Sequence, residues 1–255
     1  MQNTKLKINH LYSNYLNIYG DLGNIIALKY RSESRNISVE VCQTEIGQEH
    51  IETADIYFLG GGQDLDQIRV FEDLLRHRSF IQSEVEKGKV FLLICGGYQL
   101  FGKFFLDAQG NLIKGLEILD IETKAPGEEV KSRCIGNIVV EMSSEFTKYW
   151  DIDTNFSKYL VGFENHGGQT FFVSKKVCPI GRVISGYGNN YFEKLEGGYY
   201  KNVIGSYCHG SLLPKNPHLA DALIAKALRI QRKELADLDN EVEMKAHKFI
   251  LKPQF

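Results

Sequence analysis

Residues 89–103 read KVFLLICGGYQLFGK and contain the strongest structural signal in the chain. Five apolar residues at 90–94 follow a lysine, a pattern typical of a strand buried on both faces, as in a parallel sheet. The run leads directly into Cys95, two glycines and a segment with apolar residues at helical spacing. This order predicts a nucleophile elbow, a turn that holds a reactive side chain at the carboxyl end of the sheet.

The same pattern has a plainer interpretation, because most free cysteines are small residues of a hydrophobic core. Three other features favour catalysis for Cys95. Gln99 follows one helical turn later, and three glycines at 60–62 end a short apolar run upstream. The segment 205–216, GSYCHGSLLPKN, brings a histidine after a late strand.

The first half of the chain alternates predicted strands with predicted helices, which favours parallel βαβ units. Strands are expected at 6–12, 37–41, 56–59 and 90–94. Helices are expected at 24–31, from Asp64 onward and at 80–87, with Asp21 or Asn24 as a possible cap of the first. The predicted fold class is therefore α/β, with a largely parallel central sheet flanked by helices.

The second half is richer in strands and glycine turns. Strands are expected at 115–121, 136–142, 160–162, 170–173, 181–184 and 199–207, and a helix at 216–229. No Pro-rich linker, repeat or low-complexity stretch interrupts the chain, so a single domain over 1–255 is expected. Residues 231–255 form a charged extension, helical at 239–250, which is either a solvated surface helix or a partner-binding one.

Composition restricts the class of protein. The 255 residues include 30 basic and 32 acidic side chains, and no basic stripe supports nucleic-acid binding. Apolar runs are too short to span a membrane, and a signal-peptide core is absent. Five cysteines without a CxxC pair fit reduced thiols in the cytoplasm, so neither a disulfide framework nor a structural zinc site is expected.

Cys95 and His209 are the candidate nucleophile and base. A thiolate attacks well near neutral pH once a base lowers its pKa, and His209 is expected at the same sheet edge. Without Cys95, His209 would read as a capping or core histidine. Cys208 points to the opposite face of the strand and is expected in the core. Backbone N–H groups of Gly61, Gly62 and Gly96 are the predicted oxyanion hole.

The glycine run alone would also fit a phosphate loop. The chain has no GxxxxGK[ST] sequence, however, so no nucleotide site is evident to power an amide-forming reaction.

The segments CGGYQ (95–99), GFENHGG (162–168) and GSYCHGSLLPKN together resemble class I, triad-type glutamine amidotransferases of the cobyric acid synthase branch. The opening residues 11–31 and the loop FLGGGQD (58–64) are most similar to the glutaminase subunits that work with a Mur ligase-like (MurT-type) protein in lipid II amidation. The resemblance implies hydrolysis of L-glutamine to glutamate and ammonia through a cysteine thioester.

The resemblance also implies binding residues. Gln99 and Arg133 match positions that hold the substrate glutamine, and a guanidinium suits its carboxylate. Asn165 and His166 match a loop beside the site. A solvent-facing glutamine, a surface arginine and a hydrogen-bonded turn are the plainer alternatives for these positions.

One position departs from the common pattern. Many class I glutaminases have an acid two residues after the histidine, and Ser211 stands there in this chain. The resemblance implies that a carboxylate of the partner completes the triad in a heterodimer, so the isolated chain is expected to be weakly active. ATP and Mg²⁺ are expected on the partner, and no cofactor in this chain. The lipid-linked substrate would bring the complex to the inner membrane face.

Two alternatives stay open. One is a glutaminase for another synthetase, such as a cobyrinic acid enzyme, although an ATP-binding domain usually precedes the glutaminase there and the strand pattern here begins by residue 6. The other is a stand-alone cysteine amidohydrolase or an idle interaction module on the same fold.

Overall fold

A computed structural model describes residues 4–18, 20–106, 110–126 and 133–252. Its centre is a six-stranded sheet with the order β13-β14-β4-β3-β1-β2. All neighbours in this sheet run parallel except β13 and β14, which form an antiparallel edge. The strands are β1 (Lys5–Leu11), β2 (Ser38–Thr44), β3 (Ile56–Leu59), β4 (Val90–Ile94), β13 (Gly198–Tyr200) and β14 (Val203–Ser206).

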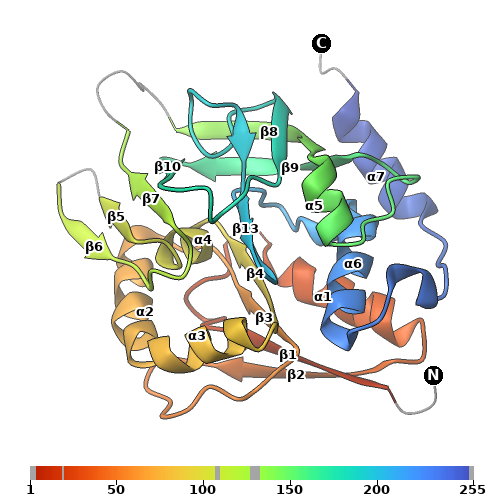
Figure 1. The fold of residues 1–255 in the computed structure, drawn as a ribbon, viewed down its shortest axis with the longest axis horizontal. Coiled ribbons are helices and arrows are strands. Elements are labelled where there is room, and N and C mark those ends of the chain that lie inside the picture. The colour runs from red at the N-terminus through yellow and green to blue at the C-terminus, as the bar shows by residue number, and fades with distance from the viewer. Residues whose placement is uncertain (1–3, 19, 107–109, 127–132, 253–255) are drawn as a thin grey trace.

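Helices lie on both faces of this sheet (Figure 1). On one side are α2 (Asp64–Arg76) and α3 (Arg78–Glu86), and on the other α1 (Leu22–Glu33) and α6 (Pro217–Leu228). Because both faces are covered, β3 and β4 are buried at every position. The predicted α/β fold with a largely parallel central sheet is confirmed.

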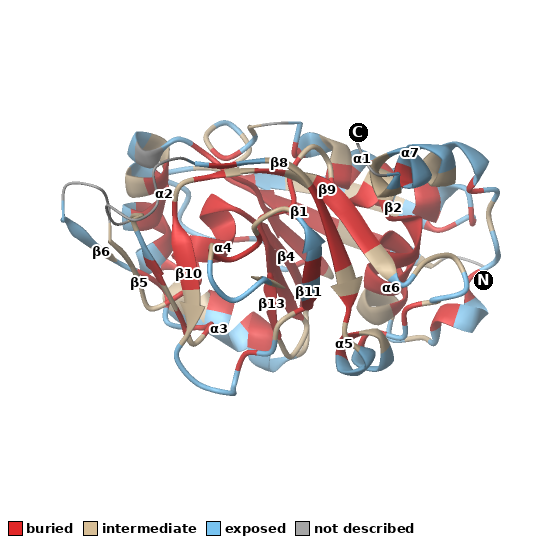
Figure 2. Cartoon of the chain, turned by 90° about the horizontal axis from the view of Figure 1, so that it is seen from above, coloured by how far each residue is buried: buried red, intermediate tan, exposed pale blue. Residues whose placement is uncertain are grey.

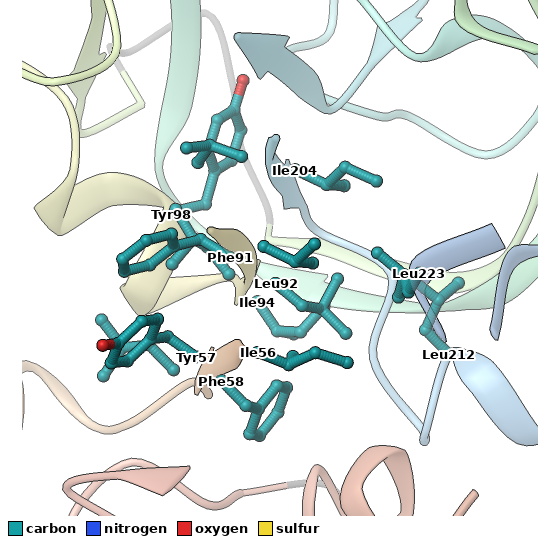
Figure 3. Close-up of a cluster of buried hydrophobic side chains, with 14 of the residues drawn as sticks. Ile56, Tyr57, Phe58, Phe91, Leu92, Ile94, Tyr98, Ile204, Leu212 and Leu223 are labelled. Atoms are coloured by element: carbon teal, nitrogen blue, oxygen red, sulfur yellow. The ribbon is translucent and has the colours of Figure 1, made fainter. Parts of the chain in front are cut away.

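The core between sheet and helices is built from aromatic and branched side chains (Figure 3). Tyr57 of β3 stacks on Phe91 of β4 with ring centroids 4.6 Å apart. Neighbouring Leu92 and Ile204 are fully buried, as is Leu223 of α6. Each Å² of apolar surface buried contributes about 25 cal/mol to the free energy of folding, so this layer is the main source of stability. The same packing holds β4, the strand that precedes Cys95, in place.

Two smaller sheets lie beyond the central one. In Figure 2, which views the molecule from above, β8 and β9 of one sheet run over the central sheet, and β5 and β6 of the other lie at one edge. One has the order β10-β7-β5-β6 and the other β12-β11-β8-β9. The first contains β5 (Phe104–Leu106), β6 (Leu112–Lys114), β7 (Ile121–Lys124) and β10 (Gln169–Phe172). The second contains β8 (Cys134–Met142), β9 (Tyr159–His166), β11 (Gly181–Ser185) and β12 (Leu195–Glu196).

Two predicted strands are wrong. Residues 115–120 form an irregular segment, in which the N–H groups of Gly115 and Leu116 donate to the carbonyls of Lys103 and Leu100. The predicted strand 199–207 is a hairpin, β13 and β14, that reverses at Lys201, where φ is +50°. Both mistakes have one cause, since a buried apolar pattern does not reveal where the chain leaves strand geometry.

The remaining elements are short or peripheral. They are α4 (Gly96–Leu100), α5 (Ser144–Tyr149), η1 (Leu213–Lys215), η2 (Arg232–Glu234) and α7 (Glu241–Leu251). The predicted C-terminal helix is confirmed as α7, while 253–255 lie outside the described residues. It is not fully solvated, because His247 is buried and contacts Lys215 O at 2.7 Å. Among the described helices, none is long and apolar enough to cross a bilayer.

Candidate active site

The backbone at Cys95 is strained. Its φ and ψ are +51° and −103°, a conformation that residues other than glycine rarely adopt. Hydrogen bonds hold it there, because Cys95 N donates to Ser206 O of the neighbouring strand at 2.8 Å and Gln99 N donates to Cys95 O at 3.0 Å. The sharp turn between β4 and α4 is the geometry of a nucleophile elbow.

His209 is placed next to Cys95 by a different route. Past the end of β14, His209 N donates to Phe163 O of β9 at 2.6 Å, and Phe163 N donates back at 3.2 Å. The imidazole is fully buried and contacts the Cys95 thiol. Cys208, read from the sequence as core, is also buried, against Gly162.

Gly61 makes the contact between thiol and imidazole possible. A Cβ at this position would lie 2.7 Å from His209 Cε1 and 3.2 Å from Cys95 Cβ. Only a residue without a side chain fits so close to both groups.

A carboxylate of this same chain faces His209. Asp21 Oδ1 lies 3.3 Å from His209 Nδ1, and both side chains are fully buried. Asp21 Oδ2 accepts the Gly61 N–H at 2.9 Å. The structure therefore places a cysteine, a histidine and an aspartate in the sequence of contacts that a catalytic triad requires.

The sequence analysis missed this role of Asp21 because it sought the acid only at position 211 and treated Asp21 as a helix cap. Asp21 does stand at the N-cap of α1, but its side chain makes no capping hydrogen bond. The chain leaves the carboxyl end of β1, two strands from β4, ten residues before Asp21. An acidic residue in the segment that follows a parallel strand at this edge of the sheet is the sequence feature that could have identified Asp21.

Cys95 and Asp21 both affect the pKa of His209. Burial lowers the pKa of the His209 imidazole, but negative charge on Cys95 and the hydrogen bond to Asp21 outweigh it and raise that pKa above its ordinary range. The protonated form of His209 is therefore favoured. A protonated imidazole next to a cysteine is what a general acid in thioester chemistry needs.

The predicted oxyanion donors have different surroundings. The N–H of Gly61 is already donated to Asp21, so in this structure it does not point at an oxyanion. Gly62 lines the pocket beside Cys95, and Gly96 follows the cysteine at the start of α4. The amides of Gly62 and Gly96 stay predictions as oxyanion donors.

The candidate binding residues gather in one pocket over Cys95. Its lining includes Ile18, Gly62, Gln67, Cys95, Gln99, Phe105, Arg133, Asn165, His166 and Gly168. Four residues taken from the resemblance are thus brought together: Gln99, Arg133, Asn165 and His166. Gln67 was not foreseen, and its Nε2 donates to Gly62 O at 2.9 Å, which fixes the glycine turn.

Hydrogen bonds to neighbouring residues orient two of these side chains, Gln99 and Arg133. The buried Gln99 donates from Nε2 to Tyr207 Oη at 3.1 Å, so its amide is oriented toward the pocket wall. Arg133 is exposed at the rim, and its guanidinium donates to Asn165 Oδ1 at 3.1 Å and to the Asn165 carbonyl at 3.2 Å. An oriented cation at the rim suits a ligand carboxylate.

His166 forms a second buried imidazole site in the pocket wall. Its Nδ1 lies 2.9 Å from Gly168 O, its Nε2 lies 3.8 Å from Glu164 Oε2, and its ring stacks on Tyr207 at 3.8 Å. Burial lowers the His166 pKa, but contacts with Cys134 and Glu164 raise it overall. The surroundings of His166 in the pocket wall therefore favour its protonated form.

The described residues include no cluster of three or more histidine, cysteine, aspartate or glutamate side chains that could hold a metal ion. The groups that are present, a thiol, an imidazole, a carboxylate and a pocket with a cationic rim, are those of acyl transfer through a thioester. The fold and the site together define a triad-type cysteine amidohydrolase.

Comparison with known proteins identifies the family. Residues 7–217 match the model of the CobB/CobQ-like glutamine amidotransferase domain. The chain belongs to this family and is a glutamine amidotransferase. The resemblance read from the sequence motifs is confirmed.

Two relatives match over most of their length. The subunit GatD of lipid II isoglutaminyl synthase (glutamine-hydrolyzing) from Staphylococcus aureus is 38% identical over 252 residues, which are 97% of this chain and 95% of that protein. The protein of the same name from Streptococcus pneumoniae is 38% identical over 88% of this chain and 81% of its own. A probable cobyric acid synthase of Methanococcus maripaludis is more distant, at 28% identity over 63% of this chain and 30% of its own.

Solved structures share the fold at low identity. The glutaminase domain of the Trypanosoma brucei CTPS with bound acivicin has a TM-score of 0.56 at 11% identity, over 88% of this chain and 94% of that chain. A crystal structure of a glutamine amidotransferase has a TM-score of 0.55 at 14% identity, over 86% and 98%. These matches establish the class I glutaminase architecture.

Proposed function

We propose that this chain is the glutamine-hydrolysing subunit of a lipid II isoglutaminyl synthase. The observation that carries the proposal is the contact series Cys95–His209–Asp21 in a chain that is 38% identical, over nearly its whole length, to a subunit of that name. The reaction supplies ammonia for amidation of the D-glutamate α-carboxyl in the peptidoglycan precursor, giving D-isoglutamine.

In the first step, the Cys95 thiolate attacks the side-chain carbonyl carbon of glutamine, whose carboxylate lies near Arg133. The N–H of Gly96 and one of the glycine turn face the developing oxyanion. His209 gives its proton to the leaving ammonia, which leaves a thioester on Cys95.

In the second step, His209 removes a proton from water, and the water attacks the thioester. Glutamate departs and the thiolate is regenerated. Asp21, which faces the Nδ1 side of the imidazole, orients His209 and stabilises its protonated form.

The partner is a Mur ligase-like, MurT-type subunit that binds ATP and Mg²⁺ and uses the ammonia in a heterodimer. This chain needs no cofactor for its own step. A partner carboxylate at His209 stays a prediction, although Asp21 already occupies Nδ1 in the single chain. The lipid-linked substrate brings the cytoplasmic complex to the inner face of the membrane.

A glutaminase for a cobyric acid-type synthetase is the second candidate, favoured by the distant match to those enzymes. If the partner is found to amidate a corrinoid and not a peptidoglycan precursor, this second function replaces the first.

The test uses the chain co-expressed with the Mur ligase-like subunit of the same organism. The complex is expected to amidate a lipid II substrate with glutamine as nitrogen donor. The Cys95→Ser complex should lose amidation from glutamine but keep it with an ammonium salt, because only ammonia production is removed. Failure of the wild-type complex to amidate lipid II from either nitrogen source would refute the proposed acceptor.

A further inference from the structure

Tyr207 lies directly behind the wall of the pocket over Cys95. It follows β14 and precedes His209 by two residues, and its backbone N–H donates to Glu196 Oε1 at 2.8 Å. Its side chain is fully buried. The role of this side chain therefore lies in the residues that it contacts.

Tyr207 contacts two residues of the pocket lining at once. Its Oη accepts the hydrogen bond from Gln99 Nε2 at 3.1 Å, and its ring stacks on the His166 imidazole with centroids 3.8 Å apart and planes 16° apart. Gln99 belongs to α4 and His166 to the end of β9. One side chain thus fixes two parts of the pocket that come from separate segments of the chain.

A series of hydroxyl groups fixes Tyr207 Oη in turn. Because Oη accepts from Gln99, its own proton is available to Thr170 Oγ1, 2.6 Å away, and Thr170 Oγ1 lies 2.7 Å from Thr123 Oγ1. The two threonines belong to β10 and β7, and all three hydroxyl side chains are buried. A buried polar network in which each member is hydrogen-bonded specifies one arrangement of side chains, since another arrangement leaves a polar atom unpaired.

The same contacts restrict the amide of Gln99 to one orientation. A Cβ on Gly168 would lie 2.5 Å from Gln99 Nε2, so the backbone of the pocket wall packs directly against this nitrogen. With Nε2 held between Gly168 and Tyr207, Oε1 is the amide atom that remains to meet a ligand in the pocket. A carbonyl oxygen accepts hydrogen bonds and does not donate them, so this wall is suited to an N–H group of the ligand.

We propose that Tyr207 is a positioning residue for glutamine binding, whose hydroxyl keeps Gln99 Oε1 turned toward an N–H donor of bound glutamine. Glutamine carries such donors on its α-ammonium and on its side-chain amide, and the shared chemistry is the N–H group. The product glutamate keeps the first donor and lacks the second. The inference rests on the glutamine hydrolysis in the proposed function and not on the acceptor that the partner amidates.

The experiment measures kcat and KM for glutamine hydrolysis by the full chain, alone and with the Mur ligase-like subunit of the same organism. Tyr207→Phe keeps the ring that stacks on His166 and removes the hydroxyl. It should raise the KM for glutamine by about 10-fold with kcat within about 3-fold, because Nε2 loses its acceptor and the amide can turn. Thr170→Val removes the next hydroxyl, should raise the KM by about 3-fold, and carries the test if Tyr207→Phe does not fold.

Tyr98→Phe is the matched control. Tyr98 is also fully buried, and its ring packs edge-on against Tyr207 with centroids 5.6 Å apart. Its hydroxyl lies elsewhere, because a Cβ on Gly198 of β13 would be 2.7 Å from Tyr98 Oη. The control variant should therefore keep both constants within about 2-fold of the wild type, although it loses the same atom from the same core.

A double variant tests whether Tyr207 acts through Gln99. Gln99→Met removes the amide and keeps the length of the side chain, and adding Tyr207→Phe to it should raise the KM by no more than about 2-fold further. The γ-methyl ester of glutamate, which keeps the α-ammonium but has no side-chain N–H, then identifies the donor. An equal rise in KM for ester and glutamine in Tyr207→Phe assigns the ammonium, and a rise for glutamine alone assigns the side-chain amide.

The outcomes separate this inference from the proposed function. If Tyr207→Phe and Thr170→Val both hydrolyse glutamine with the KM of the wild type, the positioning role is refuted while glutamine hydrolysis stands. Equal rises in KM for Tyr207→Phe and Tyr98→Phe, or full additivity with Gln99→Met, would show that the hydroxyl supports only packing and would also overturn it. A wild-type chain that hydrolyses no glutamine in either state would refute the proposed function and the inference together.

Discussion

A cysteine, a histidine and a carboxylate meet around Cys95 and again around Cys134, and of these two clusters the first has the geometry of a nucleophile. In the first, Cys95 contacts His209, which contacts Asp21. In the second, Cys134 contacts His166, which lies 3.8 Å from Glu164. Residue types and electrostatics are similar, since the pKa of each histidine is raised by its thiol and carboxylate against the effect of burial.

The clusters differ in backbone and in access. Cys95 sits at a strained turn with φ of +51° and lines the pocket shared with Gln99 and Arg133. Cys134 lies in β8 opposite His166 of β9 and is fully buried, so no substrate carbonyl reaches it. A further difference lies in the imidazoles. His209 Nδ1 faces Asp21, which leaves Nε2 for the thiol, whereas His166 Nδ1 faces a backbone carbonyl. Backbone strain and access from the pocket at the cysteine, rather than the set of side chains, separate the first cluster from the second.

Removal of the Cys95 thiol tests the comparison most strongly. Cys95→Ser is expected to lower the kcat of glutamine hydrolysis by about 10⁴-fold or more, because a serine hydroxyl is far less ionised than a thiol. Steady-state release of glutamate measures it. An unchanged melting temperature is the control, and turnover near that of the wild type would mean that the nucleophile lies elsewhere, with Cys134 as the next candidate.

Asp21→Asn is expected to have the second largest effect. The amide cannot stabilise the imidazolium, so kcat should fall by about 10²- to 10⁴-fold while the KM for glutamine changes little. Without Asp21 the raised pKa of His209 falls, so His209 loses its proton at lower pH in the variant.

The pH profile of the Asp21→Asn variant shows whether Asp21 positions His209 for catalysis or only stabilises the fold. Because the wild-type pKa is raised, stability from the protonated His209 is present below the unfolded pKa of 6.5 and is lost as pH rises through the folded value. In the Asp21→Asn variant, this contribution of protonated His209 to stability should be lost at a lower pH than in the wild type. If kcat and its alkaline limb are both unchanged, Asp21 does not position His209, and a carboxylate from the partner becomes the required third member.

The first cluster also shows how far sequence analysis reaches. The apolar run before Cys95 and the glycines after it are local features, so the elbow and the parallel sheet could be predicted and are confirmed. Asp21 could not be assigned, because its contact with His209 joins positions 188 residues apart. Nothing local distinguishes an acid that caps a helix from one that turns back toward a neighbouring strand.

The second half of the chain sets a different limit. Residues 199–207 have an apolar pattern that fits one strand or a hairpin equally well, and the turn at Lys201 depends on its left-handed backbone rather than on a glycine. The pairing of Cys134 with His166 likewise depends on the register of β8 and β9, which alternation alone does not give.

Arg133→Ala tests the binding side of the first cluster. Loss of the guanidinium at the rim should raise the KM for glutamine by about 10-fold or more with a smaller change in kcat, as expected when ground-state binding is removed. The matched control is Arg182→Ala, on the exposed side of β11, which should leave both constants unchanged. A fall in kcat without a change in KM would assign Arg133 to the chemistry instead.

Glu164→Gln tests whether the second cluster contributes charge to the pocket. The neutral amide can still accept one of the N–H bonds from Tyr187 and Gly188, now 2.7 and 2.9 Å from Glu164, but it no longer holds the His166 proton. Glutamine binding should weaken by about 3- to 10-fold, an effect of one lost charge contact. As the pH rises, glutamine binding should begin to weaken at a lower pH than in the wild type, since the raised pKa of His166 falls in the variant. Equal KM values for the two proteins between pH 7 and about pH 9, well above the ordinary histidine pKa, would show that His166 acts only in packing.

Cys134→Ala should have the smallest effect and completes the comparison. The thiol touches His166 and accepts from Gln169 Nε2 at 3.7 Å, but it lies away from the reacting carbon. We expect kcat/KM within about 2-fold of the wild type and a loss of about 1 kcal/mol in the free energy of unfolding, because a buried side chain is shortened. Denaturant melts measure the second quantity and glutamate release the first. A loss of turnover as large as that of Cys95→Ser, with stability retained, would mean that the Cys134 thiol takes part in the reaction and that access from the pocket does not separate the two clusters.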